Sequence, residues 1–173
     1  MNKKIKKLCV CGIFAALIFV ITAFVSIPAG TYGNINLGDA FIIIATFLLG
    51  PLGAVASGIG AMIADLIGPY AVYAPATLVI KILMSIACFY TYKGIRKILY
   101  WEFISKLVGT FVCETIMVLG YFLYEYILYG FSTAVISIPF NLIQGITAIV
   151  LGTSISYLLL RNKGIQKFID YLK

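Results

Sequence analysis

The stretch YAVYAPATLVIKILMSIACFY, Tyr70 to Tyr90, is apolar almost throughout and contains a single basic residue, Lys81. From Ala76 the apolar run continues to Tyr92, which is long enough for a helix that crosses a lipid bilayer. An ammonium group among leucine and isoleucine side chains is costly unless another group holds it. Lys81 therefore indicates either an internal ion pair or a functional site inside a membrane.

The composition of the whole chain places it in the same class. Of its 173 residues, 62% are hydrophobic and only 11% are charged, and the mean hydropathy is +1.08. Soluble domains carry about twice as many charged residues. At about 20 residues per crossing, the length allows five or six helices and no second domain. The sequence predicts an all-α integral membrane protein, with residues 1–173 forming one transmembrane domain.

Apolar runs separated by glycine, proline and polar residues predict six transmembrane helices. The first run follows a basic segment, as a signal peptide does, but it is as long as a full crossing and is read as a retained helix. The second run is short for a crossing, and the third is rich in small residues that favour close helix packing. The expected ranges are about 8–26, 40–50, 54–68, 76–92, 103–126 and 140–160.

The net charge of +7 is interpreted as a topology signal, with no nucleic-acid partner, because the basic residues flank the apolar runs. They cluster before the first helix, between the fourth and fifth, and after the sixth, which predicts that both termini are cytoplasmic. The segments 28–38, 68–75 and 129–138 contain no lysine or arginine and are expected outside. The flanking residues are Lys3, Lys4, Lys6, Lys7, Lys93, Arg96, Lys97, Lys106, Arg161, Lys163, Lys167 and Lys173.

Polar side chains within the apolar runs collect toward the outer side. Lys81 is expected about 9 Å below the outer end of its helix, at 1.5 Å per residue. Helical spacing places Thr77 and Lys81 on one face of their helix, and it does the same for the pair Asn141 and Gln144. The candidate binding residues are Asn34, Asn36, Asp39, Asp65, Tyr73, Thr77, Lys81, Glu114, Tyr121, Asn141 and Gln144.

A purely structural role for these groups stays open. Lys81 could pair with Asp65 or Glu114 to hold two helices together, and Asn141 and Gln144 could hydrogen-bond across a helix interface. As a set, however, ionisable groups inside a membrane are costly and usually line a substrate path. A small-molecule site, mostly apolar with a few convergent polar groups, fits this inventory.

Several chemistries have no motif in the sequence. The chain contains no histidine and no GxxxxGK[ST] motif, and its four cysteines show no CxxC spacing. We therefore expect no catalytic residue, no metal and no cofactor, and any uphill transport must draw its energy from a source other than a P-loop in this chain. A stand-alone small transporter or channel, and a membrane enzyme that uses Asp65 and Glu114, remain as alternatives.

Four stretches of the chain resemble the substrate-binding S components of energy-coupling factor (ECF) vitamin transporters, in the riboflavin-type branch that includes pyridoxine and hydroxymethylpyrimidine carriers. They are INLGDAFIIIATFLLGPLGAVASGIGAMIADL, YAVYAPATLVIK, GYFLYE and IPFNLIQG. The resemblance implies a six-helix subunit of the cell membrane that binds a vitamin at its outer side. It also implies that a membrane T subunit and two cytoplasmic ATPases drive delivery of the vitamin to the inside.

The resemblance also makes two residue-level expectations. S components typically contact the T subunit through small residues of the first helix in an AxxxA pattern, which implies a docking face at Cys11, Gly12, Ala15 and Ala16. In riboflavin carriers a lysine typically stands three residues after the asparagine that matches Asn141, where this chain has Gln144. The departure favours pyridoxine or hydroxymethylpyrimidine over riboflavin, with Glu114 or Asp65 accepting from a ring amine or hydroxyl.

Overall fold

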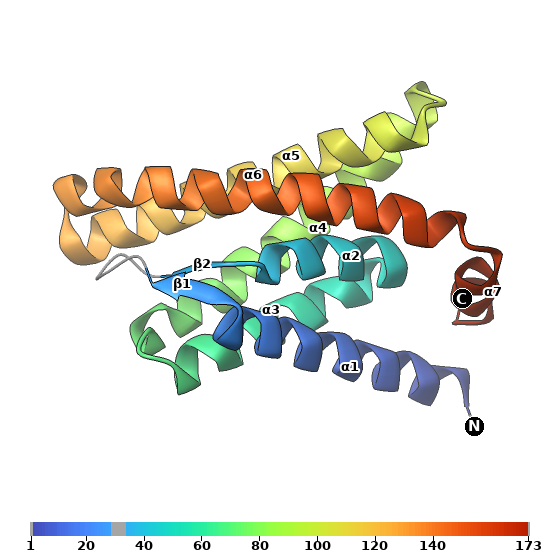
Figure 1. Ribbon diagram of the computed structural model, residues 1–173, viewed down its shortest axis with the longest axis horizontal. Helices are drawn as coiled ribbons and strands as arrows, with labels where there is room; N and C mark the ends of the chain where they lie inside the picture. Colours follow the sequence, from blue (N-terminus) through green and yellow to red (C-terminus); the bar gives the residue numbers. More distant parts are fainter. Residues whose placement is uncertain (1, 29–33, 173) are drawn as a thin grey trace.

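A computed structural model describes residues 2–28 and 34–172 and is built almost wholly from helices (Figure 1). A two-stranded antiparallel hairpin joins the first two helices, with Ile27 paired to Ile35. The elements are α1 (Lys3–Phe24), β1 (Ser26–Pro28), β2 (Asn34–Asn36), α2 (Gly38–Leu49), α3 (Pro51–Ile67), η2 (Ala71–Tyr73), α4 (Ala74–Ile98), α5 (Glu102–Tyr129), α6 (Phe131–Arg161) and α7 (Lys163–Leu172).

The predicted all-α membrane fold is confirmed in its main features. Among the described residues, four helical segments are long and apolar enough to cross a bilayer: Lys4–Phe24, Ala71–Ile98, Glu102–Tyr129 and Phe131–Arg161. Helices α2 and α3 are apolar but contain only 12 and 17 residues. At 1.5 Å per residue each is shorter than the bilayer's hydrocarbon core of about 30 Å.

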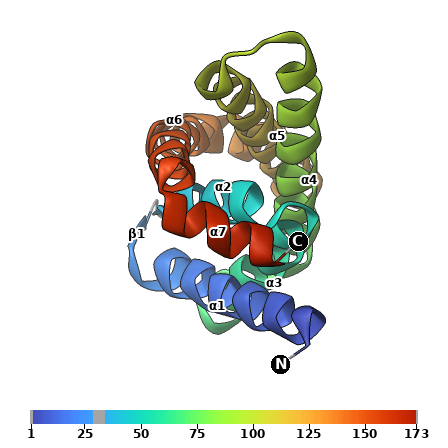
Figure 2. The same cartoon turned by 90° about the vertical axis from the view of Figure 1, so that its right-hand side faces the viewer.

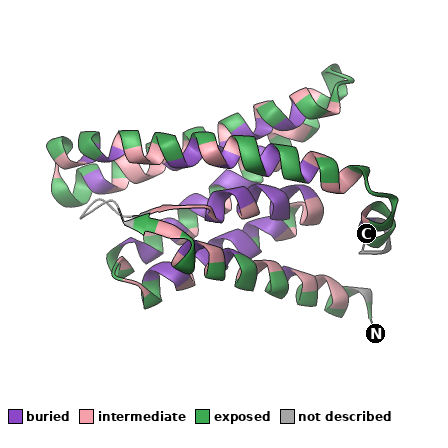
Figure 3. Cartoon of the chain, viewed as in Figure 1, coloured by how far each residue is buried: buried purple, intermediate pink, exposed green. Residues whose placement is uncertain are grey.

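Helix α2 forms the centre of the bundle, and Figure 3 shows that burial is concentrated on α2 and the neighbouring faces of its partners. One apolar cluster joins α2 to α4, α5 and α6 around Ile43 and Met117. A second joins α2 to α1 and α3 around Ile18 and Ile42. The outer faces of α4, α5 and α6 carry exposed leucine, isoleucine and valine, as lipid-facing surfaces do.

Small residues bring the helices close together, as the composition of α3 predicts. A Cβ atom at Gly60 would lie 2.4 Å from the carbonyl oxygen of Ala15 on α1, and one at Gly152 on α6 would lie 2.8 Å from Ile43 on α2. Hydrogen bonds between hydroxyl groups add to this packing, including Thr46 with Ser85 at 2.6 Å. Close approach and polar bonds of this kind are typical of helix association in lipid.

Two glycines in the left-handed region make the tightest turns. Gly50 (φ 62°) separates α2 from α3, and Pro51 then occupies the first turn of α3, where its missing N–H is harmless. Gly130 (φ 84°) separates α5 from α6. The chain reverses direction at each point without a longer loop.

Three expectations about the elements are wrong. The segment 129–138 is helical from Phe131 onward, because Gly130 alone makes the turn and Pro139 is accommodated inside α6. The hairpin β1–β2 lies in a segment that was expected to be a loop. Helix α7 follows the last long helix, where only a basic tail was expected; its polar and apolar residues alternate with helical period.

The two ends of the helix bundle are formed by different elements. Figure 1 places both termini at one end of the bundle, and the hairpin with the α5–α6 turn at the other. Figure 2, which looks onto the end with the termini, shows α7 lying across the bundle. The polar residues at the hairpin end form the site described next.

Candidate functional site

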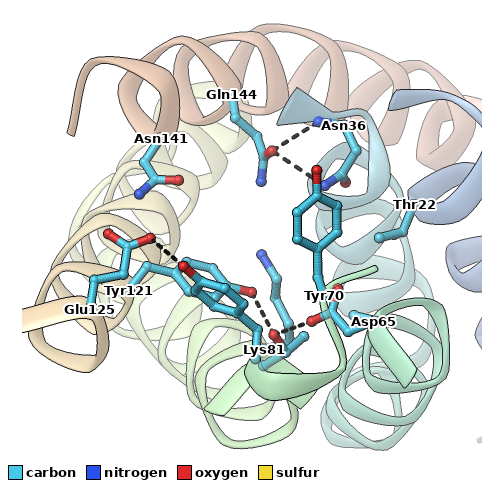
Figure 4. Close-up of a pocket in the computed structure, with 12 residues that line it drawn as sticks. Thr22, Asn36, Asp65, Tyr70, Lys81, Tyr121, Glu125, Asn141 and Gln144 are labelled. Carbon is cyan, nitrogen blue, oxygen red and sulfur yellow. Dashed lines mark hydrogen bonds between the residues drawn. The ribbon is translucent and has the colours of Figure 1, made fainter. Parts of the chain in front are cut away.

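A cavity opens among the helices near the hairpin (Figure 4). Side chains from β2, from α1, α3, α4, α5 and α6, and from the segment between α3 and α4 line it. The space between its atoms amounts to about 470 Å³, part of which is open solvent at the mouth. Figure 4 shows the Lys81 side chain reaching toward its centre, with Gln144 and Asn141 on the opposite wall. The lining residues are Thr22, Asn36, Ala61, Asp65, Tyr70, Tyr73, Thr77, Lys81, Tyr121, Glu125, Asn141 and Gln144.

Lys81 is held by an ion pair with Asp39. Its Nζ lies 2.6 Å from Oδ1 of Asp39, and the two side chains are only 5% and 1% exposed. Asp39 stands in the first turn of α2, where the helix dipole favours a carboxylate. The expected ion-pair partners of Lys81, Asp65 and Glu114, are therefore incorrect. Helix α2 packs beside α4 and brings the Asp39 carboxylate within bonding distance of Lys81.

Gln144 extends this pair into a network that also includes α6 and the hairpin. Its Nε2 donates to the second carboxylate oxygen of Asp39 at 2.6 Å, and its Oε1 accepts from the backbone N–H of Asn36 at 2.9 Å. The Asn36 side chain in turn accepts from the backbone N–H of Gly38 at 2.8 Å. The hairpin, α2, α4 and α6 thus meet at one buried polar cluster.

Asp65 anchors a second group on the neighbouring wall. Thr77 Oγ1 donates to Asp65 Oδ2 at 2.5 Å and lies 3.0 Å from the hydroxyl of Tyr121. The ammonium of Lys81 lies 5.2 Å from the centre of the Tyr121 ring, within the range of a cation–π contact. The two polar groups therefore meet at Lys81 and Tyr121.

A third carboxylate, Glu125, lies near the mouth. It accepts from the hydroxyl of Tyr73 at 3.3 Å and from Ser137 Oγ, and it is 2% exposed. The Tyr73 ring contacts four other tyrosine rings at centroid distances of 5.7 to 6.5 Å; they belong to Tyr70, Tyr121, Tyr124 and Tyr129. One side of the cavity is consequently a wall of aromatic rings.

Most of the predicted site residues come together here. Eight of them line the cavity: Asn36, Asp65, Tyr73, Thr77, Lys81, Tyr121, Asn141 and Gln144. Asp39 lies behind Lys81 and Gln144 and contacts both. Asn34 belongs to β2, and its side chain lies outside the described part of the chain.

Glu114 does not line the cavity. It is 3% exposed, and neither of its carboxylate oxygens has a hydrogen-bond partner among the residues that the structure describes. It faces α6 at Gly145: a Cβ atom added to Gly145 would lie 3.2 Å from the Cβ atom of Glu114. Asn141 Nδ2 also has no described partner, although its side chain is part of the cavity wall.

Four lining residues were not among the predicted ones: Thr22, Ala61, Tyr70 and Glu125. Glu125 carries a usable signal, because a carboxylate near the outer end of an apolar helix resembles the signal of Asp65. Tyr70 could not be told apart from the tyrosines of an interfacial belt. Thr22 and Ala61 carry no signal, since such residues occur throughout membrane helices.

The small residues of α1 divide between two faces. Cys11 is 7% exposed and its thiol lies 3.4 Å from the carbonyl oxygen of Leu52, while Ala15 packs against Gly60 on α3. Gly12 and Ala16 are exposed, and a Cβ at Gly12 would meet nothing within 4 Å. Only Gly12 and Ala16 of the four expected docking residues are open to another protein.

The site offers charged and aromatic groups for binding, and the described residues contain no group of three or more histidine, cysteine or acidic side chains that could hold a metal. A comparison with known families shows to which family the chain belongs. The model of the family described as "ECF-type riboflavin transporter, S component" matches residues 2–161. The chain belongs to this family.

Two curated proteins are similar to this S component over most of their length. An uncharacterized protein of Pyrococcus woesei is 35% identical over 147 residues, which are 84% of this chain and 95% of the relative. The thiamine precursor transporter HmpT of Lactococcus lactis subsp. cremoris is 31% identical over 164 residues, 93% of this chain and 92% of the relative.

Two solved structures share the fold. The S component of a bacterial ECF transporter has a TM-score of 0.64 at 22% identity, covering 98% of this chain and 99% of the other. The S component for biotin from an ECF-type ABC transporter has a TM-score of 0.50 at 22% identity, with coverages of 89% and 92%. The protein is therefore a multi-pass S component of the cell membrane for vitamin or precursor uptake.

Proposed function

We propose that this S component binds hydroxymethylpyrimidine or the similar heterocycle pyridoxine from the outside, with riboflavin the next candidate, and performs no chemistry on it. The observation that carries the proposal is the cavity itself, in which Lys81, Asp65 and Glu125 face an aromatic wall. A small planar ring with amine and hydroxyl groups matches such a lining. The 31% identity to the thiamine precursor transporter supports the pyrimidine in particular.

The wall offers a partner for each kind of group on such a ring. The carboxylate of Asp65 accepts from a ring amine or hydroxyl. The ammonium of Lys81 and the Nδ2 of Asn141, which has no partner among the described residues, donate to a ring nitrogen or hydroxyl oxygen. Tyr73 and Tyr121 supply flat surfaces for stacking. Glu114 is buried outside the lining and is not assigned a contact with the ligand.

The finer topology is also a proposal. With α2 and α3 counted as short crossings beside the four long helices, the chain crosses the bilayer six times and both termini are cytoplasmic. The shared location of the termini and the exclusion of lysine and arginine from the turns at the hairpin end support this orientation. The cavity then opens to the outside.

We further propose that a membrane T subunit and two cytoplasmic ATPases deliver the ligand inward, and that the T subunit docks on the face of α1 formed by Gly12 and Ala16. We expect Gly12→Leu to abolish uptake by whole cells while leaving ligand affinity unchanged, because the bulky side chain keeps two helix backbones apart. Gly94→Leu on α4 is the matched control, since a Cβ there also meets nothing within 4 Å. Undiminished uptake by the Gly12→Leu strain would rule out this docking face.

Reconstitution into vesicles separates this function from the two alternatives. Vesicles that contain the S component alone should bind radiolabelled hydroxymethylpyrimidine in an amount proportional to the amount of protein. The released compound should be chemically unchanged. Accumulation of label in the lumen would show a stand-alone transporter or channel. A chemically altered label would show an enzyme.

A further inference from the structure

A second cavity lies at the opposite end of the bundle, where both termini are found. Residues from the start of α1, the α2–α3 turn, the ends of α4 and α6, the start of α5, and α7 line it. It encloses about 1490 Å³, counting its open mouth, and shares no residue with the site near the hairpin. The proposed vitamin site therefore does not account for it.

The walls of this cavity are apolar and partly aromatic. The rings of Phe47 and Tyr92 meet edge to face with their centroids 5.2 Å apart, and Phe89 and Leu160 continue the surface. Helix α7 closes one side, because Ile169 is only 9% exposed and the Gln166 amide donates to the carbonyl of Leu160 at 2.6 Å. A lining of this kind fits a hydrocarbon chain.

The charged groups of the lining are predominantly basic. Lys7 and Lys93 both line the cavity, and the ammonium of Lys93 lies 4.5 Å from the centre of the Phe89 ring. Among the described lining residues the one carboxylate is Glu102, and Lys106 holds it at 2.6 Å. Its charge is thus compensated, and the two lining lysines leave the cavity positive.

We propose that this cavity binds one anionic phospholipid, with the lipid phosphate between Lys7 and Lys93 and an acyl chain along Phe47, Phe89 and Tyr92. Basic pockets between membrane helices on the cytoplasmic side are suited to anionic headgroups. The combination of a hydrocarbon-lined space and two lysines from different helices matches both halves of such a lipid. A peptide segment without acidic residues would satisfy the apolar wall but not this excess of positive charge.

Native mass spectrometry of the protein in mixed micelles tests the proposal, with phosphatidylglycerol and phosphatidylcholine as the probes. We expect one phosphatidylglycerol to be retained at least about tenfold more strongly than phosphatidylcholine, a difference of about 1.4 kcal/mol. The double variant Lys7→Gln/Lys93→Gln should lose this preference. The matched control Lys4→Gln/Lys97→Gln removes two exposed charges from the same helices and should keep it.

Thermal unfolding in the same micelles guards against a variant that simply folds poorly. Phosphatidylglycerol should raise the melting temperature of the wild type and the control but not of Lys7→Gln/Lys93→Gln. Equal retention of the two lipids, or equal loss in both double variants, would overturn the proposal. Displacement of the lipid by millimolar inorganic phosphate would overturn it as well, because it would show a site for a free anion.

Discussion

The substitution Lys81→Met is expected to lower both ligand affinity and stability. Its ammonium lines the cavity and also neutralises Asp39, whose side chain is 1% exposed. Breaking a buried ion pair by removing one partner costs about 3–5 kcal/mol of stability. Loss of one charged donor to the ligand should reduce affinity at least about tenfold. Melting temperature in detergent and calorimetric affinity, measured on one preparation, report the two effects.

A double variant separates the two roles of Lys81. Asp39→Asn/Lys81→Met removes both charges, so most of the lost stability should return while affinity stays low. Lys106→Met is a matched control: this lysine is also buried and paired at 2.6 Å, but it lies at the far end of the bundle. It should lower the melting temperature without changing affinity. Full recovery of affinity in the double variant would mean that Lys81 only holds α2 and α4 together.

The substitution Gln144→Glu is expected to have a comparable effect on affinity through repulsion. It keeps the shape of the side chain but replaces the amide that donates to Asp39 at 2.6 Å with an oxygen. Two carboxylates would then face each other in a buried site beside a single lysine. We expect affinity to fall at least about tenfold, a loss of about 1.4 kcal/mol or more, measured by calorimetry.

Exchanging the amide of Gln144 and the carboxylate of Asp39 tests whether the hydrogen bond between them determines ligand affinity. In the double variant Asp39→Asn/Gln144→Glu, the new amide donates to the new carboxylate, which still accepts from the backbone N–H of Asn36. Binding should recover in part, since only the strength of the Lys81 contact is reduced. If the double variant binds no better than Gln144→Glu, the network between Asp39 and Gln144 does not determine affinity.

Hydrophobicity was enough to predict the main helices α1 to α6, although not all of their ends, because a chain in lipid must satisfy its backbone within helices. The turns were harder. Gly130 alone reverses the chain between α5 and α6, whereas the sequence of 129–138, with a glycine, two serines and Pro139 directly after it, resembles a loop. Helix α7 was missed because its short polar pattern resembles a charged tail.

Most residues of the candidate site could be predicted from polar and charged side chains within the apolar runs, but their pairing could not. Intramembrane Lys81, Asp65 and Gln144 stand out because such groups are costly in lipid. Which carboxylate pairs with Lys81 depends on how α2 enters the bundle, and only the structure assigns Asp39 to it. Glu114 has the same sequence signal as Asp65, yet it packs against Gly145 and does not line the cavity.

The most direct test of the proposed function is calorimetric titration of the ligand-free protein in detergent with hydroxymethylpyrimidine, pyridoxine, riboflavin and thiamine. We predict one site per chain and binding of hydroxymethylpyrimidine or pyridoxine at least about tenfold tighter than riboflavin, a difference of about 1.4 kcal/mol. Tightest binding of riboflavin would contradict the assignment to a small single-ring ligand. Absence of binding to all four compounds would contradict the account of the cavity as a vitamin site.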